Sequence, residues 1–554
     1  MKYNKIIAMV LGGVMAVSCA DLDTEPQGST ITADQKAEVI ANNPDRVSAS
    51  VTAITTMFSV YMNALGSGYH NDFGYPSIML MTDSRGTDLV GIDTGYNWFR
   101  SALYLTEGGI NGQGSNIAWA TLYNQIYNAN AVVALIDKET EDPTLKFYLA
   151  QALAIRAFDY FNLAQLFQFT YQGNEDAPCV PLVLDTNADD AAANGLGRST
   201  VGEVYTQIMD DLNLAVELLG SSSTTRSDKR YLSYDVALGL RARVNLVMQN
   251  WAAAAADAQA AISASSATPK SMENASKPTF KSLDEEDWMW GIKIAETDRV
   301  VTSGIVNWPS HMGSLNYGYA SVGAWRMINP TLYDYINDSD VRKGWFLGRD
   351  GISSNLNQDQ QEYLIDAECP PFTQVKFAPY GDEIYASTNA CDIPLMRIEE
   401  MYLILAEAQA MGGNVSQGAA TLQTFVQTYR DPAYSVAVST AQNLQDEVWR
   451  QRRVELWGEG LSYFDILRLR KGIDRANTEF KNVDSSLPAY NYKIDDTVAE
   501  EREIIEKILK GNGGQTGGPI AALIYQLPNK EIEANTALST GDNNFSVPAL
   551  VPYK

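Results

Sequence analysis

The sequence predicts a mostly α-helical fold in which pairs of antiparallel helices form a scaffold and long loop-rich stretches interrupt it. Apolar residues recur at steps of three and four in several long segments, which is the pattern of amphipathic helices. The stretches between these segments are rich in Ser, Asn, Asp, Gly and Tyr and show no long helical period. Helical pairs are expected near 116–169, 200–263 and 394–470, and loop-rich parts near 66–114 and 264–392.

The first helical pair shows the periodic pattern clearly. Trp119, Leu122 and Ile126 share one face of the first helix. Its partner is expected to begin after Asp142-Pro143 and to end near Gln168. Two adjacent amphipathic helices joined by a short turn form an αα-hairpin.

The later helical groups carry their own start and stop signals. Thr200 is a natural N-cap and Gly220 a natural stop, and an Ala-rich helix is expected from Trp251 to about Ile262. Helical pairs rich in Ala, Tyr and Trp resemble tetratricopeptide units. The spacing between the groups is irregular, so a non-repetitive helical domain remains the alternative.

The first thirty residues predict export and lipid attachment. Two lysines precede an apolar run over 6–17, which is shorter than the roughly 20 residues that a membrane span needs. Small residues then lead to Cys19, as in a bacterial lipobox. We therefore expect a signal peptide at 1–18, a lipidated polar tether at 19–30 and a soluble domain at 31–554. An ordinary signal peptide with a chance cysteine is the alternative.

Composition argues against several classes of function. The chain has 41 Lys and Arg against 67 Asp and Glu, a net charge of −26, so nucleic acid is not expected as a partner. Only His70 and His311 are present, and neither a GxSxG motif nor a metal-ligand spacing occurs. We expect no catalytic residue, no cofactor and no metal. The many acidic residues leave a glycoside-cleaving acid pair open as the least favoured alternative.

The cysteines leave one question of pairing open. In an oxidising compartment Cys369 and Cys391 could close a disulfide, which would leave Cys179 free. Because three cysteines remain besides Cys19, an odd number, the sequence leaves the bridged and unbridged states open.

Aromatic and polar residues in the loops are the candidate ligand contacts. A flat ring stacks on the apolar face of a sugar, while Asn, Asp and Arg side chains hydrogen-bond its hydroxyls. A role in the core is the alternative for each ring. Two stretches carry the candidates: Asp93, Tyr96, Asn97, Trp98 and Arg100 in the first, and Trp308, Asn316, Tyr317, Tyr319 and Trp325 in the second.

Charged residues inside the helical segments are expected to be structural. Buried charges are rarely unpaired, so these side chains should pair across helices and fix the packing. The set comprises Arg156, Arg241, Arg397, Arg452, Arg453, Glu455 and Glu459.

Several segments together resemble the SusD/RagB family of outer-membrane nutrient-binding lipoproteins. They include IAWATLYNQIYNANAVV, STVGEVYTQIMDDLNLAVELL and IYQLPNKEIEANTAL, and the most specific is RRVELWGEG followed by FDILR. They occur in the family's order over nearly the whole mature chain. The late segment departs from the family, with Tyr-Gln-Leu-Pro in place of Tyr-Pro-Ile-Pro.

The resemblance implies a helical scaffold displayed on the outer face of the outer membrane, anchored through an N-terminal lipid. Family members act as a lid over a TonB-dependent (SusC-like) transporter, capturing oligosaccharides, or oligopeptides in some branches. Asp21 and Asp23 are similar to the signal that sends such lipoproteins to the surface. Contact residues vary with the ligand, so none is carried over. The expected function is non-catalytic oligosaccharide binding for uptake, with oligopeptide binding as the alternative.

Overall fold

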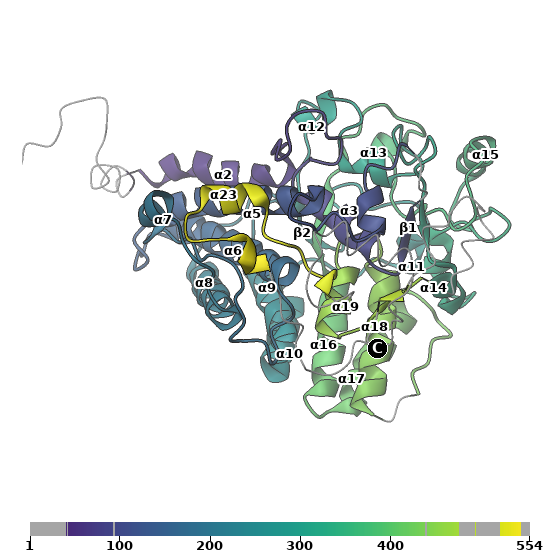
Figure 1. The fold of residues 1–554 in the computed structure, drawn as a ribbon. Coiled ribbons are helices and arrows are strands. Elements are labelled where there is room, and N and C mark those ends of the chain that lie inside the picture. The colour runs from purple at the N-terminus through teal and green to yellow at the C-terminus, as the bar shows by residue number, and fades with distance from the viewer. Residues whose placement is uncertain are drawn as a thin grey trace, which may run out of the picture.

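Long helices form one part of the molecule, and short elements gather in another. The computed structural model describes residue 40 and residues 43–91, 95–437, 440–475, 493–494 and 521–543. The signal peptide, Cys19 and the tether therefore lie outside the described residues. In Figure 1 the helical pairs occupy the left and lower parts, and the short helices cluster at the upper right.

The long helices pack one against the next and confirm the predicted mostly helical fold. Each helix contacts the next in the series α5, α6, α8, α9, α10 and α16, and α16 also packs against α17 and α18. Their bounds are α5 Gln113–Val133, α6 Pro143–Phe167, α8 Val201–Ser221, α9 Tyr234–Val247, α10 Trp251–Ala264, α16 Ile398–Met411, α17 Val415–Tyr429, α18 Ala441–Glu455 and α19 Ser462–Arg468.

The predicted helix ends are close to the observed ones. The Asp142 carboxylate accepts hydrogen bonds from two backbone N–H groups at the start of α6, whose C-cap is Gln168. Thr200 and Glu203 form a capping box at the start of α8. In α6 every residue over 149–167 is buried, because helices pack on several of its sides.

Short strands were not predicted, and one of them corrects a predicted helical boundary. The segment near 394 begins as strand β4 (Ile393–Arg397), which pairs antiparallel with β2 (Trp288–Ile292). Likewise β1 (Leu89–Gly91) pairs with β3 (Arg326–Ile328), and β5 (Ile473–Asp474) with β6 (Lys493–Ile494). All residues of β2 and β4 are buried, so neither shows the alternation that identifies a half-buried strand.

The loop-rich parts contain short helices. Helix α3 (Tyr75–Arg85) is buried at all 11 positions and so lacks an amphipathic pattern. Its N-cap, Gly74, has φ +84°, and a Cβ there would lie 2.3 Å from the Phe58 carbonyl oxygen, so glycine is required. The other short elements are η2 Pro44–Val47, α2 Ser48–Thr56, η3 Met57–Ser59, α4 Arg100–Leu103, α7 Ala188–Asn194, α11 Met272–Ala275, α12 Arg299–Thr302, α13 Trp308–Met312, α14 Pro330–Tyr335, η4 Val341–Trp345, α15 Gln358–Asp366, η5 Tyr380–Asp382, α23 Asn529–Ala534 and η7 Thr540–Asn543.

The charged helix residues are structural, as predicted. Arg156 pairs with Asp211 at 2.7 Å and Arg452 with Asp465 at 2.6 Å. A larger group, which we call the buried ionic network, joins β4, α16, α17 and α18. It consists of Arg342, Lys376, Arg397, Glu399, Arg430, Glu455 and Glu459.

The cysteines in the described part of the chain are free thiols, so the disulfide considered for Cys369 and Cys391 is not formed. The thiol of Cys391 is buried and directed at the Ala378 carbonyl oxygen, 3.7 Å away. Cys369 instead packs in a separate apolar cluster with Leu364. None of the helices within the described ranges is long and apolar enough to span a membrane.

Candidate ligand-binding site

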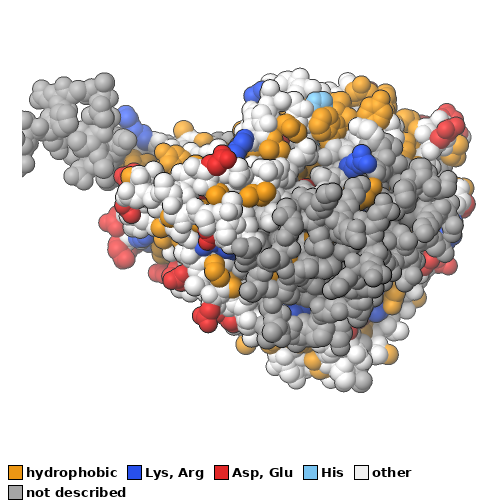
Figure 2. Space-filling view, viewed as in Figure 1, with side chains coloured by type: hydrophobic (Ala, Val, Ile, Leu, Met, Phe, Trp, Pro, Cys, Tyr) orange, Lys and Arg blue, Asp and Glu red, His pale blue; other side chains and the backbone are white. Residues whose placement is uncertain are grey.

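Aromatic side chains from three loop segments meet near α13. His70 comes from the loop before α3, Tyr96 and Trp98 from the loop after β1, and Tyr319 from the loop after α13. We call these four residues the aromatic platform. Figure 2 shows hydrophobic side chains gathered around a histidine at the top of the molecule, the region where Figure 1 places α12 and α13.

The rings of the platform are in contact and partly accessible. His70 stacks on Trp98 with centroids 4.7 Å apart and an interplanar angle of 24°. The Tyr319 ring lies 5.9 Å from His70 and 6.3 Å from Tyr96. Tyr96 is 55% exposed, whereas Tyr319 is 6% exposed. The platform therefore presents an accessible ring beside rings that are held in place by their neighbours.

A buried histidine supports the platform from beneath. His311 stacks between Phe73 and Tyr319, with centroid distances of 5.5 Å and 4.6 Å. Its Nε2 and the carbonyl oxygen of His70 are 2.8 Å apart, and if Nε2 carries the proton it donates to that oxygen. Burial and the nearby positive charge of Arg326 hold the pKa of His311 well below its ordinary value, so the ring is neutral at physiological pH.

Arg326 and Asn97 connect the segments that carry the platform. The Arg326 guanidinium donates to the Asn97 side-chain oxygen at 3.1 Å and, through Nε, to the His311 carbonyl oxygen at 3.1 Å. Asn97 also accepts the backbone N–H of Phe99 at 3.1 Å. Asn97 is 4% exposed, so its role is to hold the loop of Tyr96 and Trp98.

A second group of tyrosines flanks the loop that carries Tyr319. Tyr317 packs edge-on against Tyr385 at 5.1 Å, and Tyr363 lies 5.9 Å from Tyr385. Tyr317 is 38% and Tyr385 44% exposed. These rings extend the accessible aromatic surface beyond the platform.

Besides Asn97 and Tyr319, three further candidates are buried. Trp308 is 2% exposed and packs edge-on against Phe377 in the core. Asn316 is buried and donates to the Asn389 side-chain oxygen at 3.2 Å. Trp325 is buried as well. Their surroundings come from distant parts of the chain, which local sequence does not reveal.

The remaining candidates fall into two groups. Arg100 is exposed at the start of α4, and its guanidinium lies 5.9 Å from the centre of the Tyr104 ring. Asp93 lies outside the described residues.

His70 and Tyr385 were not among the candidates. The only sequence signal for His70 was its place in the irregular stretch GSGYHNDFGYP.

The chemistry of this surface is that of stacking and hydrogen bonding. The platform offers ring faces and the hydroxyl group of Tyr96, and Tyr317 adds a further hydroxyl on the flanking tyrosines. Within the described ranges, no group of three or more His, Cys, Asp and Glu side chains is placed to hold a metal ion. Fold and surface together define a helical-repeat protein with an accessible aromatic surface.

Comparison with known proteins assigns the chain to a family. One family model, described as "Starch-binding associating with outer membrane", matches residues 82–246, and the SusD family model matches residues 371–544. Both models describe SusD-like proteins, and many solved SusD superfamily structures share the fold of this chain. The chain belongs to the SusD/RagB family. A search of curated proteins found no match.

Solved structures share the whole architecture. A SusD-like carbohydrate binding protein from Bacteroides vulgatus is 21% identical, with 90% of this chain and 98% of that one covered and a TM-score of 0.68. A putative sugar binding protein from the same organism is also 21% identical, with coverage of 90% and 97% and a TM-score of 0.64. A laminarin binding SusD-like protein is 18% identical, with coverage of 88% and 97% and a TM-score of 0.56. These similarities establish a common fold.

Proposed function

We propose that this protein binds oligosaccharides at the cell surface through the aromatic platform and passes them to a TonB-dependent transporter, without making or breaking a bond. The platform is the observation that carries the proposal, because the exposed Tyr96 ring with its hydroxyl, beside the half-buried Trp98 ring, matches the apolar and hydroxyl faces of a sugar. The relatives described as carbohydrate, sugar and laminarin binding support the ligand class.

Calorimetric titration against a panel of oligosaccharides and oligopeptides tests the ligand class. We expect at least one oligosaccharide to bind, and Tyr96→Ala and Trp98→Ala each to weaken its binding by roughly fivefold or more, since stacking contacts contribute about 1 kcal/mol or more. Tyr127→Ala is the matched control, because Tyr127 on α5 is 66% exposed and outside the platform.

Two results would contradict this ligand class. Binding of peptides alone would replace oligosaccharide with oligopeptide as the ligand. If Tyr96→Ala and Trp98→Ala both bind the oligosaccharide with unchanged affinity, the ligand binds at another surface. Analysis of the bound glycan for products after prolonged incubation tests whether the protein is catalytic. If products form, and mutating one carboxylate abolishes their formation, the protein is a hydrolase.

The anchor and the transporter are parts of the same proposal. A signal peptide at 1–18 and a lipid on Cys19 would hold the protein at the outer membrane, and the polar tether at 19–30 would leave the body free to move over a barrel. We expect Cys19→Ser to release the protein from membranes. Co-purification with a SusC-like transporter encoded beside it tests the partner, and a protein isolated alone in mild detergent would count against it.

A further inference from the structure

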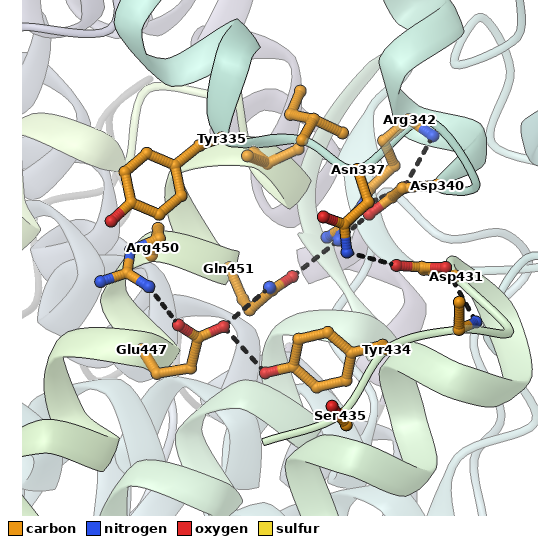
Figure 3. Close-up of a pocket in the computed structure, with 13 residues that line it drawn as sticks. Tyr335, Asn337, Asp340, Arg342, Asp431, Tyr434, Ser435, Glu447, Arg450 and Gln451 are labelled. Atoms are coloured by element: carbon orange, nitrogen blue, oxygen red, sulfur yellow. Dashed lines mark hydrogen bonds and ion pairs between the residues drawn. The ribbon is translucent and has the colours of Figure 1, made fainter. Parts of the chain in front are cut away.

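A cavity of about 250 Å³ lies far from the aromatic platform, between the C-terminal end of α14, the loop after α17 and helix α18. Figure 1 places α14 and α18 at the lower right and α13 at the top. Figure 3 shows the side chains that surround the cavity. Those that matter here are Tyr335, Asn337, Asp431, Ser435, Glu447 and Arg450.

The cavity is a built site whose walls are fixed by hydrogen bonds. The Glu447 carboxylate accepts the Tyr434 hydroxyl at 2.8 Å and the Gln451 amide at 3.0 Å. Arg342 donates to the Gln451 side-chain oxygen at 2.6 Å and to Glu455 of the buried ionic network at 3.2 Å. The polar groups are thereby held in place before any ligand arrives, which lowers the entropy cost of binding.

One wall carries an arginine with free donors. The Arg450 guanidinium lies over the Tyr335 ring at 4.3 Å and donates through Nη1 to Glu447. Its Nε and Nη2 have no hydrogen-bond partner among the residues that the structure describes. Tyr335 is 53% exposed, so its ring forms an open rim to the cavity.

The opposite wall offers acceptors. The Asp431 carboxylate accepts the Asn337 amide at 2.8 Å and the Ser339 hydroxyl at 2.7 Å. Burial raises its pKa, but these hydrogen bonds outweigh burial and hold the pKa below the ordinary value, so Asp431 is ionised at neutral pH. The Ser435 hydroxyl also lines the cavity and has no partner within the described ranges.

These groups select a neutral ligand rich in hydroxyls. Three carboxylates, Asp340, Asp431 and Glu447, face two guanidiniums, Arg342 and Arg450, so an anion meets an excess of negative charge. Donors and acceptors alternate around one small space, and a hydroxyl group serves both. Drug-sized ligands occupy pockets of roughly 300–1,000 Å³, so this cavity suits a single ring.

We propose that this cavity is a second binding site, which takes one neutral sugar ring and is separate from the aromatic platform. The ring's hydroxyls accept from Arg450 and donate to Ser435, and the Tyr335 rim covers one edge. The proposal does not depend on the function of the platform, because no platform residue lines the cavity.

Saturation-transfer NMR on the full mature chain tests this site. The probes are D-glucose, D-galactose, D-mannose and D-xylose, with D-glucuronate and D-glucosamine as charged counterparts. We expect transfer to at least one neutral sugar. Arg450→Met, which keeps the contact with Tyr335 but removes the donors, and Tyr335→Ala should each weaken binding about tenfold, as for one lost hydrogen bond to a charged group.

Two control variants separate the possible outcomes. Tyr127→Ala replaces another exposed tyrosine, 66% exposed against 53% for Tyr335, and should leave the signal unchanged. Trp98→Ala removes a platform ring, so loss of the signal in this variant would place the sugar on the platform and overturn the proposal. Absence of transfer to every neutral sugar, or stronger binding of a charged counterpart, would also overturn it. Circular dichroism verifies that each variant is folded.

Discussion

Trp98 and Trp308 both lie in stretches that the sequence predicts to be loop-rich, yet only Trp98 belongs to an accessible surface. Trp98 is half-buried and stacks on His70, whereas Trp308 is enclosed by the core beside Phe377. The sequence could suggest both rings as ligand contacts because each sits among polar residues and glycines. It could not separate them, since burial depends on residues distant in the chain. The same reason explains why His70 was missed.

The burial of Asp159 predicts how the stability of the fold depends on pH. Its carboxylate is fully buried in α6, and neither oxygen has a hydrogen-bond partner among the described residues. Burial raises its pKa well above the ordinary 3.8. The folded state therefore keeps a proton that the unfolded state releases, so stability falls as pH rises from about 4 to the raised pKa.

We expect Asp159→Asn to remove this dependence. The free energy of unfolding of the variant, relative to the wild type, should increase with pH by up to about 1.4 kcal/mol per pH unit across that window. Urea denaturation between pH 4 and 8 measures it. Asp189→Asn, at an exposed position on α7, is the control and should follow the wild type. If the difference in free energy of unfolding between Asp159→Asn and the wild type stays constant from pH 4 to 8, Asp159 does not titrate with a raised pKa.

At the scale of elements, sequence signals predicted those helices that have one polar face and a cap. Helix α8 has a capping box and an amphipathic pattern, and it was placed within two residues at each end. Helix α3 and strand β4 are buried throughout, so their sequences lack the periodicity that distinguishes helix from strand. His70 of the aromatic platform lies in the loop before α3, so the sequence did not reveal this part of the platform.

The buried ionic network holds β4 against α18. Arg397 donates to Glu455 at 3.0 Å and to Glu459 at 2.8 Å, and all three side chains are buried. Removing one partner of a buried ion pair leaves a charge without compensation, which typically costs about 3–5 kcal/mol. We expect Arg397→Met to lower the free energy of unfolding by that amount in urea denaturation.

An exposed ion pair provides the matched comparison. Arg349 and Asp334 are paired at 2.8 Å, but both side chains are about half exposed, 51% and 53%. Exposed pairs contribute about 0–1 kcal/mol, so Arg349→Met should change stability little. Equal effects of Arg349→Met and Arg397→Met would show that the network does not stabilise the fold.

At the scale of the whole molecule, an early segment ties the platform to the C-terminal helices. Arg453 on α18 donates through Nε to the Asp88 carboxylate at 2.8 Å, and the Trp457 indole donates to the Asp88 carbonyl oxygen at 3.0 Å. The next residue, Leu89, begins β1, which pairs with the strand that contains Arg326. The helical scaffold therefore positions the loops that carry the aromatic rings.

We expect Asp88→Ala to affect stability and binding together. Losing the buried carboxylate leaves Arg453 without its partner and should lower the free energy of unfolding by about 3 kcal/mol, as for one broken buried pair. Because β1 and β3 then lose an anchor, the Asn97–Arg326 contact should loosen and oligosaccharide affinity should fall, even at temperatures where the variant is folded. Denaturation and calorimetric titration on the same preparation measure the two effects. Asp189→Ala should change neither the stability nor the affinity. If Asp88→Ala loses stability but binds the oligosaccharide normally, the contact of Asp88 with the scaffold does not position the binding site.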